Sequence, residues 1–203
     1  MSRFFAVAAS AVVVAGLGAT LWVIQMNTSR SFADCSGSEV AGGDLGGPFT
    51  LVDENGRTVT DADIVTEPTL IYFGYTFCPD VCPLDVMRNA QAIDILDEQG
   101  VSVTPVFISI DPARDTPEVV ADFTDNFHDR MIGLTGSEEQ VAAASRAYRT
   151  FYQKSGDDPE YYLMDHTTFS YLTLPEIGFV EFFRQTASPE EMAETIACYA
   201  AAA

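Results

Sequence analysis

A strongly apolar run that leads into two closely spaced cysteines limits the possible folds of this chain most. Residues 69–75 read TLIYFGY, a β-branched and aromatic run that is typical of a central strand buried on both faces. The segment CPDVCP follows at residues 78–83. From Val81 to Gln99 apolar residues recur at helical spacing, and Gly100 then acts as a stop signal. The two thiols are therefore predicted to lie at a strand-to-helix junction.

The spacing of Cys78 and Cys82 indicates chemistry at this junction. Residues four positions apart in a helical turn share one face, so both sulfurs can converge on one point. The N-terminus of a helix stabilises negative charge, and we expect at least one of the two to be a thiolate near neutral pH. An inert disulfide is disfavoured because the loop that it would close is very short. The spacing favours redox or metal function over a buried structural role, without choosing between the two.

Strand and helix patterns alternate along the rest of the chain. We expect a hairpin at 49–60 that turns at Asn55-Gly56, a strand at 101–110, a helix opened by Thr116-Pro117, a helix at 137–151, a hairpin at 168–184, and a last helix from Ser188, at capping-box spacing from Glu191. This order suggests an α/β, thioredoxin-like fold with a central mixed sheet flanked by helices.

The N-terminal residues differ in composition from the rest of the chain. The net charge of −20 excludes most nucleic-acid ligands, because a phosphate backbone would repel the protein, yet every acidic residue lies at or beyond Asp34. Residues 4–24 are uncharged, and as a helix they span about 31 Å, which matches the hydrocarbon core of a bilayer. We expect a transmembrane helix there, with a cleaved secretory signal as the alternative.

Three regions follow from this composition. We expect a membrane anchor at 1–25, a Gly-rich linker at 26–47 and an acidic domain at 48–203. The chain is then a single-pass protein of the inner (cytoplasmic) membrane, with its soluble domain facing the periplasm.

A third ligand would favour metal over redox function, and the chain has two histidines. His128 lies at the polar end of a predicted helix, where a solvated or helix-terminal role is favoured. His166 precedes the predicted hairpin at 168–184, and a thioredoxin-like sheet brings the loop before this hairpin against the thiol-bearing helix start. Met164 is interpreted as a core thioether rather than a ligand.

Three motifs together make the sequence resemble the Sco/SenC family. They are YFGYTFCPDVCP at 72–83, ISIDPARDTP at 108–117 and DHT at 165–167, and the resemblance covers about residues 45–200. Members of this family are copper-binding proteins of cytochrome c oxidase assembly. The resemblance implies that Cys78 and Cys82 are thiolate ligands and that His166 is an imidazole ligand. Such a set suits Cu(I), and with further coordination it can hold Cu(II).

The resemblance also implies partners and a function. Family members are thought to deliver copper to the dinuclear copper site of cytochrome c oxidase subunit II, to reduce its cysteines, or both. We therefore expect a membrane-tethered metallochaperone rather than an enzyme, with an upstream copper donor and subunit II or a related acceptor as partners.

Other functions of the cysteine pair remain open as alternatives. A thiol–disulfide reductase that cycles Cys78 and Cys82 is one, although thioredoxin has two residues between its cysteines and a facing proline that residues 165–168 lack. A peroxidase fits less well, because Tyr75 stands where its threonine would be expected. A redox or copper sensor is not distinguished from a chaperone.

Four further residues carry secondary hypotheses. Asp111 and Asp115 match the family's D-x-x-x-D segment, and they either support the metal loop or only cap the strand exit and the helix start. Cys35 and Cys198 lie outside the central motifs. Because exported proteins tend to avoid unpaired thiols, we hypothesise a structural disulfide that ties the linker to the last helix.

Overall fold

The structure, a computed structural model, describes residues 32–35, 45–158 and 161–203 and centres on a seven-stranded sheet. Its strands are β1 (Thr50–Asp53), β2 (Thr58–Thr60), β3 (Thr69–Gly74), β4 (Thr104–Ser109), β5 (Ile132–Thr135), β8 (Ser170–Leu174) and β9 (Gly178–Phe183). Their order across the sheet is β2-β1-β5-β4-β3-β8-β9. Strands β3, β4 and β5 run parallel, whereas β1 and β8 pair antiparallel with β5 and β3. The sheet is therefore mixed, as predicted.

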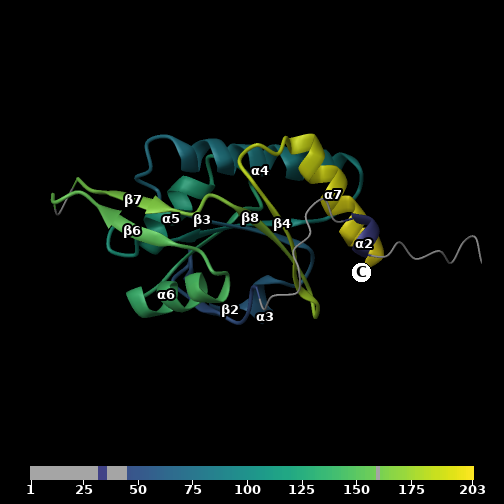
Figure 1. Cartoon of the computed structure of the whole chain (residues 1–203). Coiled ribbons are helices and arrows are strands. Elements are labelled where there is room, and N and C mark those ends of the chain that lie inside the picture. Colours follow the sequence, from purple (N-terminus) through teal and green to yellow (C-terminus); the bar gives the residue numbers. More distant parts are fainter. Residues whose placement is uncertain (1–31, 36–44, 159–160) are drawn as a thin grey trace, which may run out of the picture.

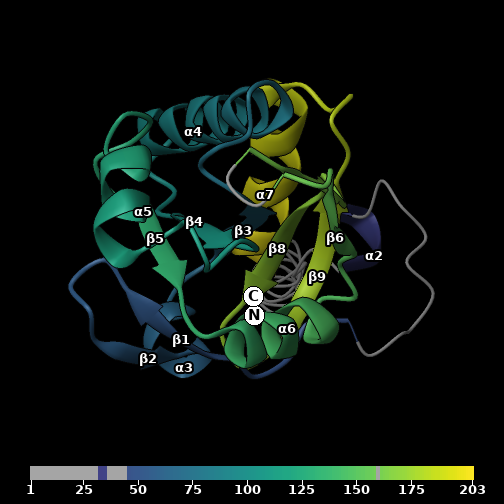
Figure 2. The ribbon, with the colours of Figure 1, turned by 90° about the vertical axis from the view of Figure 1, so that its left-hand side faces the viewer.

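Helices cover both faces of this sheet. They are α2 (Phe32–Cys35), α3 (Asp61–Ile64), α4 (Val81–Glu98), α5 (Pro117–Thr124), α6 (Glu138–Ala147) and α7 (Pro189–Ala202). Figures 1 and 2 show α4 and α7 side by side over one face and α6 against the other. A separate two-stranded sheet of β6 (Tyr152–Ser155) and β7 (Leu163–His166) extends from this body as a hairpin (Figure 1).

Strand β3 lies in the interior of the sheet, and all six of its residues are buried. Its side chains alternate between the two helical layers. The Tyr72 hydroxyl donates a hydrogen bond to Asp85 of α4 (3.0 Å), whereas the Phe73 ring lies 5.4 Å from that of Tyr148, beside α6. Because both faces need apolar or hydrogen-bonded groups, the uninterrupted TLIYFGY run is what this position requires.

Local capping signals explain where the helices begin. Thr116 accepts a hydrogen bond from the backbone N–H of Val119 and precedes Pro117, so it caps α5 as predicted. Ser188 and Glu191 form the predicted capping box of α7. The hairpin turning at Asn55-Gly56 is also present, as β1 and β2.

Several predicted boundaries and elements are wrong. The helix expected at 137–151 ends at Ala147, because Arg149 adopts a left-handed conformation (φ 50°) and Ser145 instead bonds the carbonyl of Thr150. The strand expected at 101–110 begins at Thr104, whose N–H bonds the carbonyl of Pro68, directly before β3. Strand β5 and the β6–β7 hairpin were not expected.

A disulfide joins Cys35 of α2 to Cys198 of α7, as hypothesised. Beside it the rings of Phe32 and Tyr199 lie 5.5 Å apart. This part of the expected linker is thus fixed to the C-terminal helix. In the ranges that the structure describes, no helix is long and apolar enough to cross a bilayer. The span predicted at 4–24 lies outside those ranges.

Candidate metal centre

Three potential metal ligands meet at one end of the sheet. One ligand atom from each of Cys78, Cys82 and His166 lies within 4.8 Å of the others. Cys78 lies in the loop after β3, Cys82 in the first turn of α4, and His166 at the last position of β7. The structure therefore brings together the three residues that the sequence motifs singled out, from segments more than 80 positions apart.

The turn before α4 places the two sulfurs beside each other. Helix α4 begins at Val81, so Cys78 precedes the helix rather than sharing a helical face with Cys82, as the spacing had suggested. The N–H of Cys78 bonds the carbonyl of Tyr75 (3.3 Å), and the N–H of Cys82 donates to the Cys78 sulfur (3.3 Å). The two sulfurs therefore converge, as expected, but through the turn and the first residues of α4 rather than through one helix that contains both cysteines.

Gly74 makes room for the buried sulfur of Cys82. A Cβ at this position would lie 3.1 Å from that sulfur, 2.8 Å from the Tyr72 ring and 3.0 Å from the Phe107 ring. A side chain at position 74 would therefore clash with the Tyr72 ring and crowd the Cys82 sulfur.

The proton is shared unequally between the two cysteines. The Cys82 side chain donates a hydrogen bond that lowers the pKa of Cys78 to about 3, and the backbone N–H groups of Asp80 and Cys82 add to this effect against burial. The same hydrogen bond, reinforced by burial, raises the pKa of the Cys82 thiol. The metal-free pair is therefore one thiolate at Cys78 and one thiol at Cys82, in agreement with the predicted thiolate.

His166 is oriented with a free ring nitrogen toward the sulfurs. Its Nδ1 lies 2.9 Å from the carbonyl oxygen of Thr167, which can only accept, so Nδ1 carries the proton. In the neutral ring Nε2 is then the acceptor, and it lies 3.4 Å from the Cys82 sulfur. The rings of Tyr72 and Tyr75 meet the imidazole edge-on, with centroids 6.3 and 5.8 Å away. This is the tautomer that a metal-binding imidazole requires.

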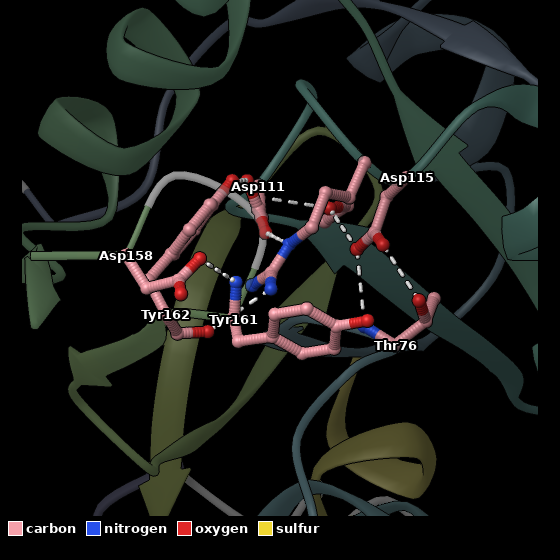
Figure 3. Close-up of polar contacts among 8 residues, drawn as sticks. Thr76, Asp111, Asp115, Asp158, Tyr161 and Tyr162 are labelled. Atoms are coloured by element: carbon pink, nitrogen blue, oxygen red, sulfur yellow. Dashed lines mark hydrogen bonds and ion pairs between the residues drawn. The ribbon is translucent and has the colours of Figure 1, made fainter. Parts of the chain in front are cut away.

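Asp115 holds the loop that carries Cys78. Its buried carboxylate accepts hydrogen bonds from the backbone N–H and the hydroxyl of Thr76 (3.0 and 2.6 Å) and from the hydroxyl of Ser109 (2.5 Å). Figure 3 shows its contacts with Thr76. Burial raises the pKa of this carboxyl group. Since Thr116 provides the helix cap, the side chain of Asp115 supports the cysteine loop instead.

Asp111 connects the same segment to the β6–β7 hairpin. Its carboxylate accepts from Arg114 Nε (2.5 Å) and from the hydroxyl of Tyr162 (2.6 Å). Its backbone N–H also bonds the hydroxyl of Ser109 (3.0 Å). Asp111 therefore touches no ligand directly, but it contacts the hairpin that carries His166.

A buried polar network lies behind Cys82. Asp85 accepts from the Tyr72 hydroxyl (3.0 Å) and from Arg88 (2.9 Å), and Arg88 also reaches the hydroxyl of Ser170 on β8 (3.3 Å). These bonds fix the first turns of α4 against β3 and β8, and with them the position of the Cys82 sulfur.

The other residues considered from the sequence lie outside the cluster. His128 follows α5, and its Nε2 lies 3.7 and 3.9 Å from carboxylate oxygens of Asp94 and Asp97 on α4. Met164 is half-buried and packs against the main core, the apolar cluster that also contains Cys78 and Cys82, as expected for a thioether.

Sequence reasoning missed the roles of Arg114 and Tyr162. Arg114 was visible only as part of a motif, and Tyr162 was assigned to no element. One signal was present, because Tyr162, Met164 and His166 alternate with the exposed residues Tyr161, Leu163 and Asp165. This period of two is typical of a strand with one face toward the protein.

Comparisons with known proteins agree with this geometry. The SCO1/SenC family profile matches residues 38–201. Protein SenC of Rhodobacter capsulatus is 48% identical over 194 residues, which covers 96% of this chain and 88% of SenC. The mitochondrial SCO1 homolog of Homo sapiens is 42% identical over 158 residues, 76% of this chain and 52% of the human protein.

A solved structure also matches the fold. The crystal structure of Arabidopsis thaliana ScoI with copper bound has a TM-score of 0.73 and 39% sequence identity, and the match covers 76% of this chain and 98% of that one. Copper is thus the metal held by a solved relative, and the Cys-Cys-His group here can hold a metal.

Fold and site together define a class of protein. It is the class of thioredoxin-like domains in which a Cys-x-x-x-Cys pair and a histidine remote in sequence lie close together in space. The chain belongs to the SCO1/SenC family, as its three motifs predicted. It spans about half the length of the longer human relative.

Proposed function

We propose that this protein binds one copper ion through Cys78, Cys82 and His166 and helps to assemble the dinuclear copper site of cytochrome c oxidase subunit II or of a related acceptor. The observation that supports this best is the convergence of the three ligand atoms within 4.8 Å, from segments far apart in sequence. Two thiolates and one imidazole suit Cu(I), and a further ligand allows Cu(II).

The donor set fits a metal that must be passed on. Cys82 is completely buried and Cys78 is 7% exposed, so both sulfurs lie inside the protein, whereas the half-buried His166 borders the surface. Copper binding displaces the proton of Cys82, because the metal takes the place of that proton between the sulfurs. Three protein ligands leave a position that an acceptor's ligand can occupy before the old bonds break.

We further propose that the domain works close to a membrane. The uncharged residues 4–24 supply a single-pass anchor in the inner membrane, and the acidic domain faces the periplasm. Because Cys35 is bonded to α7, the free tether is shorter than the whole predicted linker 26–47. Residues 26–31 are what separates the proposed anchor from α2, and six residues span at most about 20 Å even when fully extended.

Copper titration of the full chain in detergent tests this proposal. The protein is prepared copper-free with the two free thiols reduced and is titrated with Cu(I) against a competing chelator. We expect one tightly bound copper per chain, and at least about tenfold weaker binding for His166→Ala, Cys78→Ser and Cys82→Ser. His128→Ala is the matched control, since this histidine lies outside the cluster. Equal binding by His166→Ala and the unmodified protein contradicts the proposed ligand set.

A second candidate function is reduction of a partner's disulfide. The observation that favours it is the asymmetry of the pair, a thiolate at Cys78, which is 7% exposed, and a completely buried thiol at Cys82. In such a reaction Cys78 attacks the partner's disulfide, and Cys82 then resolves the mixed disulfide. Two electrons pass to the partner, and Cys78 and Cys82 become a disulfide.

The two candidates predict different results for one variant. His166→Ala removes a copper ligand but neither sulfur, so a reductase retains most of its rate of disulfide reduction whereas a copper carrier loses affinity. An unmodified protein that binds no copper, yet reduces the subunit II disulfide rapidly, favours the reductase.

A further inference from the structure

The β6–β7 hairpin carries His166 but forms a separate sheet. Its two strands pair only with each other in the described part of the chain, with Tyr152 opposite His166 at the base. An isolated two-stranded hairpin is marginally stable in water. Met164 and Tyr152 pack their side chains against the main core. The part of the hairpin beyond them needs another attachment if the imidazole is to keep its position.

A group of three side chains provides such an attachment, and we call it the Arg114 cluster (Asp111, Arg114 and Tyr162). Arg114 bonds Asp111 (2.5 Å) and the carbonyl oxygen of Tyr162 (3.0 Å), and its guanidinium lies 3.6 Å from the centre of the Tyr162 ring. The Tyr162 hydroxyl completes the group by donating to Asp111 (2.6 Å). Figure 3 shows Asp111 and Tyr162 of this group together, with Asp158 beside them accepting from the N–H of Tyr161.

The same segment also contacts the cysteine loop. The guanidinium of Arg114 lies 4.6 Å from the centre of the Phe77 ring, and Phe77 is the neighbour of Cys78. The next residue, Asp115, bonds both the N–H and the hydroxyl of Thr76. Residues 111–115 thus hold the loop before Cys78 on one side and the hairpin of His166 on the other.

Strand geometry connects the cluster to the ligand. Tyr162 and His166 lie four residues apart on one face of the β7 segment, with Met164 between them. At about 3.3 Å per residue the separation is about 13 Å along a stiff extended chain. A hairpin fixed at both Tyr162 and Met164 cannot swing, so the His166 ring stays within reach of the sulfurs.

We propose that Arg114 and Tyr162 are positioning residues which hold the His166 hairpin against the cysteine loop and so assemble the copper site before the metal arrives. This inference rests on the proposed function, because it takes His166 as a copper ligand. Groups that orient metal ligands change metal affinity by about 10- to 100-fold when they are removed. Arg114 is suited to the task because its planar fork bonds two groups and stacks on a ring at once, which lysine cannot do.

A double-mutant cycle on the full chain separates positioning from general destabilisation. Cu(I) affinity is measured by chelator competition for Arg114→Ala and Tyr162→Phe, each alone and combined with His166→Ala. We expect Arg114→Ala to weaken binding by about tenfold or more alone, and by less than about twofold when His166 is already absent. Tyr162→Phe, which loses one hydrogen bond and keeps the ring, is expected to have a smaller effect of the same kind.

Arg130→Ala is the matched control. Arg130 also pairs with a carboxylate, that of Asp97 (2.6 Å), but contacts no residue of the hairpin in the described structure, so its removal is expected to leave copper affinity unchanged. Equal losses for Arg114→Ala with and without His166 overturn the positioning role. Unchanged affinity in both Arg114→Ala and Tyr162→Phe overturns it as well.

Amide hydrogen exchange in the copper-free protein tests the attachment independently of copper. Backbone amides of β6 and β7 are expected to exchange at least about tenfold faster in Arg114→Ala, while those of β3 and β4 keep their rates. If the unmodified protein binds no copper, the proposed function fails, and this measurement still decides whether the cluster holds the hairpin. Unchanged exchange in the hairpin overturns the inference even if copper binds.

Discussion

Removal of the Cys35–Cys198 disulfide should destabilise the domain strongly. The two cysteines are 163 positions apart, so the bond closes a loop that contains nearly all of the described residues. In the chain-entropy account, opening a loop of this length restores unfolded-state entropy worth about 5 kcal/mol at 25 °C. Native domains are stable by only about 5–15 kcal/mol, so the loss is a large part of the total.

The assay is urea unfolding of the full chain in detergent, followed by far-ultraviolet circular dichroism. The double variant Cys35→Ala/Cys198→Ala is compared with the unmodified protein under non-reducing conditions. The urea concentration at the midpoint of unfolding should be lower for the double variant than for the unmodified protein. A reductant should lower this midpoint in the unmodified protein and leave that of the double variant unchanged. Copper affinity should stay the same, because this disulfide lies in the apolar cluster between α4 and α7, whereas Cys78 and Cys82 lie in the other apolar cluster.

One result would refute this reasoning. If the double variant loses less than about 1 kcal/mol, the disulfide does not act through the entropy of the unfolded chain as the loop length requires. The packing of α2 on α7 would then hold the segment without a covalent bond, and the short tether proposed for the membrane anchor would no longer depend on the disulfide.

Two further predictions concern the cysteine pair. Because hydrogen bonding lowers the pKa of Cys78 to about 3, the copper-free protein should keep one thiolate per chain as the pH falls from neutral, and ultraviolet thiolate absorbance should disappear only near pH 3. The folding stability that this thiolate contributes is complete above the pKa of a cysteine in the unfolded chain, about 8.5, and is lost as the pH falls toward 3. A thiolate absorbance that titrates with a midpoint near pH 8.5 would contradict the hydrogen bonding of Cys78. Gly74→Ala should cost about 1–3 kcal/mol in thermal unfolding and weaken copper binding, since the new Cβ lies 3.1 Å from the Cys82 sulfur, and unchanged values for both would show that the strand end moves freely.

Signals carried by neighbouring residues were readable from the sequence. The buried strand β3, the helix caps at Thr116 and Ser188 and the turn at Asn55-Gly56 each depend on a few adjacent side chains, and each was predicted correctly. The helix at 137–151 was extended too far because Tyr148 and Phe151 continue its apolar pattern. Only the left-handed Arg149 and the bonds to Ser145 show that the chain leaves the helix.

Non-local pairing explains the elements that were missed. Strand β5 is short, and its partners β1 and β4 come from earlier parts of the chain, so its own four residues give little signal. In β7 the exposed and half-buried residues alternate, but in β6 the two exposed residues Gln153 and Lys154 are adjacent and polar side chains dominate, so β6 gives no such pattern. These elements are stabilised by contacts that a local reading cannot include.

Residue type and spacing are covalent properties of the chain, and they already show which side chains can bind copper and how many positions separate the two cysteines. The residue pattern also indicates that Cys78 follows a buried strand and that Cys82 enters a helix. The folded arrangement was needed to learn that His166 reaches the two cysteines, that the proton rests on Cys82, and that Arg114 and Tyr162 lie between the hairpin and the cysteine loop. Each of these depends on distances between segments that are remote in sequence, and only folding sets such distances.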